Sequence, residues 1–190
     1  MLWRQVIFLL LVSLSPIRSI YQSYFKRSAL GNEYLPQNPI QLLAQDTCQS
    51  RLLCAVRCNL QASCRALDYD SISLRCRLFE GDLSTGSIVS SASSTSMVEL
   101  VIVSRSLFVQ GQPHSCQECE ESRYEMCAPN GSTCQCRPHT FWNNSTCTLQ
   151  RLINSTCSQI DGCRADLNLT CVKNFYGQLA LCSSGQFSCS

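Results

Sequence analysis

The sequence lacks the motifs on which many enzyme active sites depend. It contains only two histidines and neither a Gly-x-Ser-x-Gly nor a His-Glu-x-x-His motif. His114 lies beside Gly111 and Pro113, and His139 lies in a loop between cysteines. Neither setting favours a buried pocket in which catalytic groups converge. We therefore expect no catalytic residues, no cofactor and no enzyme activity.

Long apolar runs and an excess of one charge are also missing from most of the chain. The best apolar run after the N-terminus, Met97 to Val103, has seven residues and includes Glu99. A membrane-spanning helix needs roughly 20 residues, so we expect no span. Loss of residues 1–19 would remove Arg4 and Arg18 from the 15 basic residues, leaving 13 basic and 13 acidic residues. This balance predicts no nucleic-acid partner.

The N-terminus has the pattern of a secretory signal peptide. Arg4 gives a short positive start, an apolar run from Val6 to Leu14 is broken only by Ser13, and a polar exit ends at Ser19. A buried helix is the alternative, but the length and flanks favour targeting. We predict a signal peptide of residues 1–19 and a secreted, extracellular protein.

Sixteen of the 190 residues are cysteine, which in an oxidising compartment indicates a disulfide scaffold. Cys116-x2-Cys119 with Cys134-x-Cys136 could supply four zinc ligands, but the compartment favours disulfides, so we expect no metal. Oxidation also disfavours a thiolate nucleophile. The cysteines expected to form disulfides are Cys48, Cys54, Cys58, Cys64, Cys76, Cys116, Cys119, Cys127, Cys134, Cys136, Cys147, Cys157, Cys163, Cys171, Cys182 and Cys189.

The segment from Cys54 to Cys76 organises the first half of the chain. Cys54 and Cys58 lie four residues apart within 51–61, which has no Gly or Pro and in which Leu53, Val56 and Leu60 recur at helical spacing. Asp46, Thr47 and Ser50 are all candidate helix caps. Leu74, Cys76 and Leu78 alternate with Arg75, Arg77 and Phe79, which is typical of a strand. These patterns predict a helix stapled to a small antiparallel sheet.

The first half of the chain resembles the PAN/apple fold of extracellular adhesion and receptor modules. The resemblance lies in the order of a helix with Cys-x3-Cys, a strand with Ala-Leu-Asp-Tyr-Asp and a next strand with Cys-Arg-Leu-Phe. The resemblance covers residues 20–107 and implies an α+β module with one helix on an antiparallel sheet. It also implies an edge strand near the start and disulfides Cys54–Cys76 and Cys58–Cys64. Four cysteines alone allow three pairings. The serine-rich segment 84–96 predicts a surface loop with a short strand around Ile88 and Val89, and Met97 to Val103 predicts the closing strand.

Residues 108–115 form the expected linker, and a cysteine-rich texture begins at Cys116. Cys119-x7-Cys127 recurs as Cys163-x7-Cys171, which indicates an internal repeat. Residues 116–147, with a Cys-x-Cys pair in fourth and fifth place, resemble an EGF-like module of loops and β-hairpins. The resemblance implies the pairs Cys116–Cys127, Cys119–Cys134 and Cys136–Cys147. Arg137 to Thr146 lacks the glycine usual in that family, and residues 148–190 resemble a divergent or incomplete second copy.

Five Asn-x-Ser/Thr sequons lie between Cys127 and Cys171, and their confinement to a loop-rich region favours N-glycosylation. They begin at Asn130, Asn143, Asn144, Asn154 and Asn168. Asn143 and Asn144 overlap, so we expect only one of the two to be used.

Taken together, the patterns predict a secreted, small disulfide-rich, non-enzymatic glycoprotein that recognises an extracellular protein or carbohydrate ligand. The alternatives are a secreted protease inhibitor, with a reactive segment such as Arg137 to Thr146, or the N-terminal part of a larger cell-surface receptor. Cys48 and Cys189 are left over by the pairing and can bond each other or join two chains in a disulfide-linked dimer.

Overall fold

The computed structural model describes residues 24–102, 116, 119, 123–131, 133–174 and 176–184. We call residues 24–102 the N-terminal region and the described residues from 116 onward the cysteine-rich region. The expected signal peptide and the linker lie outside the described residues, as do His114 and Cys189.

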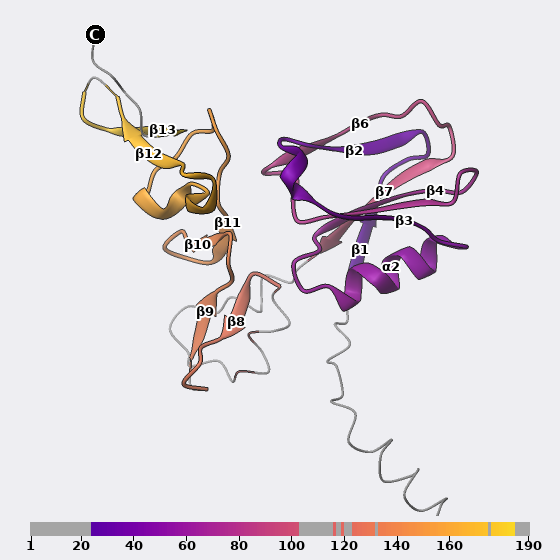
Figure 1. The fold of residues 1–190 in the computed structure, drawn as a ribbon, viewed down its shortest axis with the longest axis horizontal. Helices are drawn as coiled ribbons and strands as arrows, with labels where there is room; N and C mark the ends of the chain where they lie inside the picture. The colour runs from indigo at the N-terminus through magenta and orange to yellow at the C-terminus, as the bar shows by residue number, and fades with distance from the viewer. Residues whose placement is uncertain are drawn as a thin grey trace, which may run out of the picture.

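A five-stranded antiparallel sheet forms the centre of the N-terminal region (Figure 1). Its strands stand in the order β1 (Tyr24–Arg27), β7 (Ser96–Ile102), β4 (Ala66–Asp70), β5 (Arg75–Phe79) and β3 (Leu42–Thr47). β1 is an edge strand, in the place that the resemblance implies. The closing strand β7 pairs with both β1 and β4, so it lies inside the sheet.

The middle strand β4 is covered on both faces. All five of its residues are buried. Because successive side chains of a strand point to opposite faces, Leu67 and Tyr69 share one face while Ala66, Asp68 and Asp70 share the other. Leu67 and Tyr69 join the core cluster beneath the helix, and Ala66 joins a second cluster with Tyr34 and Phe79. The sheet is therefore the middle of three layers.

Helix α2 (Arg51–Leu60) forms one outer layer and packs against β4 and β5. Ser50 is its N-cap, with its side chain accepting a hydrogen bond from Leu53 N at 3.3 Å. Asp46 and Thr47, the other candidate caps, belong to β3. The helix buries Cys54, Ala55 and Cys58. The apolar residues at helical spacing, Leu53, Val56 and Leu60, lie instead on the exposed side of the helix. The reason is that the two disulfides hold the cysteine face against the sheet.

The expectation that Leu74 belongs to the β5 strand is wrong. β5 begins at Arg75, and Leu74 has φ +57° in the turn that joins β4 to β5. A tight connection between two adjacent antiparallel strands needs a residue with positive φ, and here leucine occupies that position. Cys76 and Leu78 do face the helix side, in the core cluster beneath α2.

A two-stranded ribbon forms the other outer layer (Figure 1). β2 (Asn32–Pro36) pairs with β6 (Gly86–Ser90), which is the short strand in the serine-rich segment. Tyr34 is buried, with its ring centroid 4.8 Å from that of Phe79. A Cβ atom at Gly86 would lie 2.1 Å from the Tyr34 hydroxyl, so the ribbon can approach this ring only with glycine there. Between β2 and β3, the 3₁₀ turn η1 (Pro39–Gln41) is capped by Asn38.

The cysteine-rich region consists of three small hairpins and two 3₁₀ turns. β8 (Glu125–Cys127) pairs with β9 (Cys134–Cys136), and β10 (Thr140–Trp142) pairs with β11 (Cys147–Leu149). After η3 (Ile160–Gly162) and η4 (Ala165–Leu167), β12 (Thr170–Lys173) pairs with β13 (Leu179–Ser183). The last part has its own small core of Cys163, Leu169, Cys171 and Cys182. Among the described residues, no helix is long and apolar enough to cross a membrane.

Candidate functional site: the junction of two regions

Two disulfides fix helix α2 to the sheet. Cys54 is bonded to Cys76 in β5, and Cys58 is bonded to Cys64 just before β4. These are the pairs that the PAN/apple resemblance implies. The first closes a loop with a sequence separation of 22 and the second one of 6. The shorter loop holds residues 59–63 at the C-terminal end of α2, where the cysteine-rich region makes contact.

Five further disulfides hold the cysteine-rich region. Cys116–Cys127, Cys119–Cys134 and Cys136–Cys147 are the pairs that the EGF-like resemblance implies. The sequence left the later pairs open, and the structure joins Cys157 to Cys171 and Cys163 to Cys182. The sulfurs of Cys157, Cys163 and Cys182 lie within 4.8 Å of one another. Because all three are in disulfides, they offer no thiolate to a metal ion.

Cys48 is a free thiol in the structure and is buried in the core beneath α2. The Tyr69 hydroxyl donates to its carbonyl oxygen at 3.2 Å. A bond from Cys48 to a second chain would require this core to open locally. Cys189 lies outside the described residues, so a Cys48–Cys189 bond stays a prediction.

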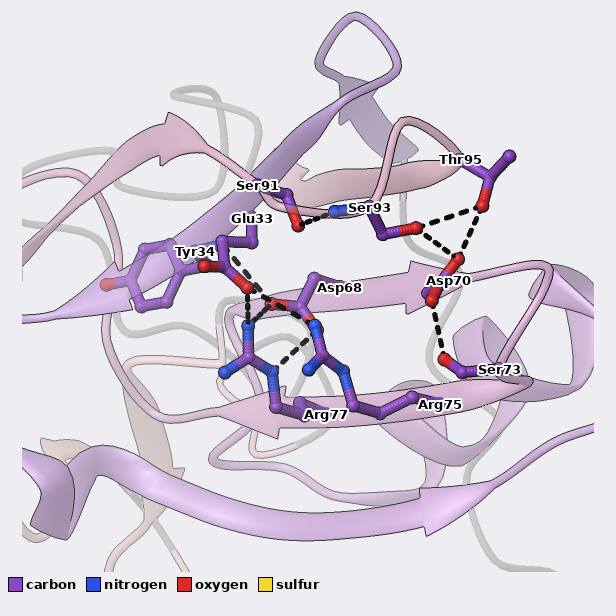
Figure 2. A network of polar contacts seen from close by, with 10 residues as sticks. All are labelled: Glu33, Tyr34, Asp68, Asp70, Ser73, Arg75, Arg77, Ser91, Ser93 and Thr95. Carbon is purple, nitrogen blue, oxygen red and sulfur yellow. Dashed lines mark hydrogen bonds and ion pairs between the residues drawn. The ribbon is translucent and has the colours of Figure 1, made fainter.

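A polar network lies between the β2–β6 ribbon and the central sheet (Figure 2). Arg77 Nε donates to Asp68 Oδ1 at 2.9 Å, and its Nη2 reaches both Asp68 and Glu33. Arg75 adds a 3.2 Å bond to Glu33. Burial acts to lower the pKa of Arg77, but the hydrogen bonds and charges of Asp68 and Glu33 outweigh it and raise that pKa. The network thus compensates the burial of Asp68.

Asp70 anchors the other end of the same layer (Figure 2). Its carboxylate accepts hydrogen bonds from the hydroxyls of Ser73, Ser93 and Thr95 and from Ile72 N. The bonds from Ser73 and Thr95 above all hold the pKa of Asp70 well below its usual range. Four donors occupy the carboxylate, which indicates a role in joining the β4–β5 turn to the loop before β7 rather than in binding a ligand.

A pair of arginines joins the two regions. Arg123 is buried, and its Nη1 donates to Cys64 O at 2.6 Å and to Cys58 O at 3.3 Å. Its Nη2 donates to Asn59 Oδ1 at 2.6 Å. Cys58 O also accepts from Gln61 N at 3.2 Å, so Arg123 adds a second donor at this helix end and supplies the donor for Cys64 O after it. Arg65 returns the contact by donating to Arg123 O at 2.6 Å.

Arg65 packs against an aromatic ring of the cysteine-rich region. Its guanidinium carbon lies 4.4 Å from the centroid of the Tyr124 ring, within the range of a cation–π interaction. The Tyr124 hydroxyl donates to Asp82 in the N-terminal region at 2.7 Å. Burial lowers the pKa of Arg65 and raises that of Tyr124. The two side chains therefore tie together segments that the sequence assigns to different modules.

A second contact between the regions is ionic. Glu80, directly after β5, accepts from Arg164 Nη1 at 3.1 Å and lies 2.7 Å from His139 Nδ1. Arg164 also makes a two-bond contact with Asp166, each bond 2.7 Å long. These bonds lower the pKa of Asp166. Burial acts to lower the pKa of Arg164, but the hydrogen bonds to Asp166 and the negative charges of Glu80 and Asp166 outweigh it and raise that pKa. His139, the one histidine within the described residues, thus has a place in the junction.

Beside these contacts lies a cleft of about 440 Å³, which we call the junction cleft. The N-terminal region contributes Ile40, Leu43 and the segment after α2, and the cysteine-rich region contributes Pro138 and charged side chains. Its size falls within the range of ligand-binding pockets, roughly 300–1,000 Å³. Ile40 is partly exposed at its edge. The arrangement can bind an amphipathic group through apolar walls and fixed charges.

The residues that build the junction were not recognised from the sequence. Arg65, Arg137 and Arg164 each directly follow a cysteine, so a disulfide fixes the backbone beside each of them. A repeated Cys-Arg pair was therefore an available signal, although it does not show which region each arginine contacts. All five sequon asparagines are exposed, and all lie in the cysteine-rich region.

Residues 32–106 match the PAN domain. PAN domains bind protein or carbohydrate in extracellular proteins. The match takes in α2 and six of the strands, together with Glu80 and the residues that Arg123 contacts. It ends before the cysteine-rich region. No curated protein matches the chain.

Proposed function

We propose that the chain is a secreted, non-enzymatic glycoprotein whose PAN domain recognises an extracellular protein or carbohydrate. The observation that carries the proposal is the PAN match over residues 32–106, on a helix and sheet joined by two disulfides. None of the five sequons lies within 32–106, so no N-linked glycan would be attached to this domain itself.

We propose further that residues 116–147 form an EGF-like module that acts as a fixed support for the PAN domain. Two hairpins and three disulfides favour this interpretation. Arg123 and Tyr124 of this region contact the N-terminal region through buried bonds. The junction cleft, which needs both regions, is then the proposed ligand site.

The structure does not favour a protease inhibitor with a reactive segment at Arg137 to Thr146. Thr140 to Trp142 of this segment form β10, which pairs with β11, and Thr140 and Phe141 are buried. Thr140 and Phe141 therefore cannot enter a protease cleft, which leaves the exposed tip of the hairpin, residues 142–145, for such a contact. Incubation with a panel of serine proteases would test the alternative, because stoichiometric inhibition would support it.

The test of the proposed function uses the full secreted chain as a probe for extracellular-matrix extract and for a glycan array. Ile40→Ser changes an exposed side chain at the junction cleft and should weaken binding about tenfold, because loss of a buried apolar contact costs roughly 1–2 kcal/mol. Ile72→Ser is the matched control. Ile72 is also exposed, but it lies in the turn at the opposite end of β4 and β5.

Loss of binding after treatment of the extract with an N-glycosidase would identify an N-linked carbohydrate ligand, and binding on the glycan array would identify a carbohydrate of another linkage. Equal binding by the Ile40 and Ile72 variants would show that the ligand does not use the junction cleft. Absence of any ligand in both assays would contradict the proposed function.

A further inference from the structure

A second cavity, of about 340 Å³, lies entirely within the cysteine-rich region, outside the PAN match. We call it the Arg151 cavity. Its walls come from the β10–β11 hairpin on one side and from residues 156–162 on the other. It shares no lining residue with the junction cleft. A ligand here would be bound independently of the one proposed for the PAN domain.

Backbone hydrogen bonds hold the two walls together, and a disulfide fixes one wall to β12. Phe141 and Thr148 are opposite each other in the β10–β11 register. Arg151 N donates to Gly162 O at 2.7 Å, and Arg164 N donates to Arg151 O at 3.0 Å. Cys157, in the opposite wall, is bonded to Cys171. The cavity is therefore formed before any ligand arrives, which lowers the entropic cost of binding.

The charge of the cavity is positive. Arg151 lines it, and no aspartate or glutamate does. Within the part of the chain that the structure describes, Arg151 has no carboxylate partner. Its Nη1 donates to Ser84 O at 2.7 Å, which fixes the side chain while leaving other N–H donors of the guanidinium. A planar guanidinium with spare donors is suited to bind a carboxylate through two bonds.

Hydroxyl groups surround this charge. Thr148, Thr156 and Ser158 line the cavity, and their hydroxyls make no hydrogen bond to another described residue. Each hydroxyl can both donate and accept, as the hydroxyls of a sugar can. Apart from Phe141, the lining offers no large apolar side chain against which a hydrophobic peptide could pack. The lining therefore favours a polyhydroxylated ligand with one negative charge.

Phe141 and Gly162 provide the apolar part of the wall. A Cβ atom at position 162 would lie 3.6 Å from Cζ of Phe141, so the absence of a side chain there leaves room beside the ring. Phe141 is otherwise buried, so the C–H groups of a sugar ring can contact only the part of its ring that lines the cavity. One aromatic ring, one arginine and three hydroxyls together match the groups of a single sugar unit.

We propose that the Arg151 cavity binds a carboxylated sugar unit, with the carboxylate on Arg151 and the sugar hydroxyls on Thr148, Thr156 and Ser158. This site would give the chain a second recognition function beside that of the PAN domain. It does not depend on the proposed function, because none of its lining residues lies within 32–106.

The sequon at Asn143 has to be controlled in the test, since Asn143 also lines the cavity. Its Oδ1 accepts hydrogen bonds from Ser145 N at 3.1 Å and Thr146 N at 2.9 Å. A glycan on Asn143 would compete with a free sugar. Ser145→Ala removes this sequon and keeps both the Asn143 side chain and the overlapping Asn144 sequon.

The experiment measures the binding of methyl β-glucuronide and methyl β-glucoside to the full chain by saturation-transfer NMR, with and without Ser145→Ala. The two probes differ only by a carboxylate in place of a hydroxymethyl group. We expect the glucuronide to bind at least about tenfold more tightly, because a hydrogen bond to a charged group is worth roughly 1.5–3 kcal/mol. Arg151→Gln should abolish this preference, and Thr148→Val should weaken binding of both probes.

Lys173→Gln is the matched control, since it removes one exposed positive charge from β12 in the same region. Unchanged melting temperatures and disulfide-bonded masses would establish that the variants fold. Three outcomes would each overturn the proposal. They are equal binding of both probes, no binding of the glucuronide to the Ser145→Ala chain, and an unchanged preference for the glucuronide in Arg151→Gln. Matrix binding through the junction cleft should be the same in Arg151→Gln and wild type, so failure of one proposal is distinguishable from failure of the other.

Discussion

At the scale of single residues, several hydrogen bonds compensate each of three buried charged side chains among the described residues. Arg123, Asp68 and Asp70 are all buried and all make multiple bonds. Removing a charge from water is costly unless its donors or acceptors are satisfied. Each of these residues joins segments distant in sequence, so its substitution should affect more than its own surroundings.

Arg123→Ala should destabilise the chain by about 3 kcal/mol. The substitution removes the donor of the buried Cys64 carbonyl and several further bonds, whereas Cys58 O keeps its bond from Gln61 N; a buried carbonyl left without a donor is costly. Arg57→Ala is the control, because Arg57 lies on the same helix in an exposed ion pair with Asp46, worth at most about 1 kcal/mol. Denaturant unfolding with the disulfides intact measures the loss of stability in both variants. Similar small losses in the two variants would show that the junction does not stabilise the helix end.

Asp70 should make stability depend on acid pH. An aspartate in the unfolded chain has a pKa of about 3.9. The pKa of Asp70 in the folded state lies below this value. A depressed carboxyl pKa stabilises the folded state above the unfolded pKa, and this contribution is lost as pH falls through the folded value. Asp70→Asn should therefore lower the melting temperature at pH 7 and show a smaller fall between pH 5 and pH 2 than wild type. Parallel melting curves of the two proteins across this range would contradict the assignment.

At the scale of elements, helix α2 depends on tertiary contacts. It has ten residues, and isolated helices shorter than roughly 12–15 residues are marginal in water. Its buried face consists of Cys54, Ala55 and Cys58, so disulfides replace the usual apolar face. Near its end, Cys58 O accepts hydrogen bonds from Gln61 N, the C-cap residue, and from Arg123 of the cysteine-rich region. The orientation of the helix is thus set by covalent bonds and a long-range contact.

Cys54→Ser should impair secretion and lower the melting temperature. Chain entropy for a loop of this length corresponds to roughly 3 kcal/mol, a large share of the stability of a small domain. Leu52→Ser is the control, since Leu52 lies on the same helix, is exposed and takes no part in a disulfide. Secretion levels in culture medium and thermal unfolding provide the measurements. Normal secretion with unchanged melting of Cys54→Ser would mean that the Cys54–Cys76 pairing is wrong.

At the scale of the whole molecule, the two regions share buried contacts. Arg123 and Arg65 form one set, and Glu80, Arg164 and His139 form another. Both sets lie next to disulfides, which restrict the backbone on each side. We infer that the PAN domain and the cysteine-rich region act as one unit, and that the junction cleft requires both.

The number of cysteines leads to a prediction for the intact chain. Cys48 is the free thiol among the described residues, and Cys189 is its candidate partner outside them. We expect a monomer without a free thiol, because two odd cysteines in an oxidising compartment rarely stay reduced. Non-reducing electrophoresis combined with thiol counting on the unfolded chain decides the matter. A reducible dimer would favour bonds between chains, and two titratable thiols would exclude both arrangements.

The sequence by itself determined the local elements of the N-terminal region. Helical spacing located α2, and the alternation around Cys76 located β5, because these periods reflect local backbone geometry. The resemblance implied the disulfide pairs that the structure contains. β3 was missed because its residues are mostly exposed and show no regular apolar alternation. Leu74 was misassigned because an alternating pattern alone does not show where the preceding turn ends.

Only the tertiary structure decided which face of α2 is buried, which arginines join the regions and which residues line the Arg151 cavity. Arg123 contacts residues about sixty positions earlier, and Arg164 contacts Glu80 across 84 positions. Ser84 likewise fixes Arg151 across 67 positions. Local pattern contains no information about such contacts, because they depend on how separately folded segments pack against one another.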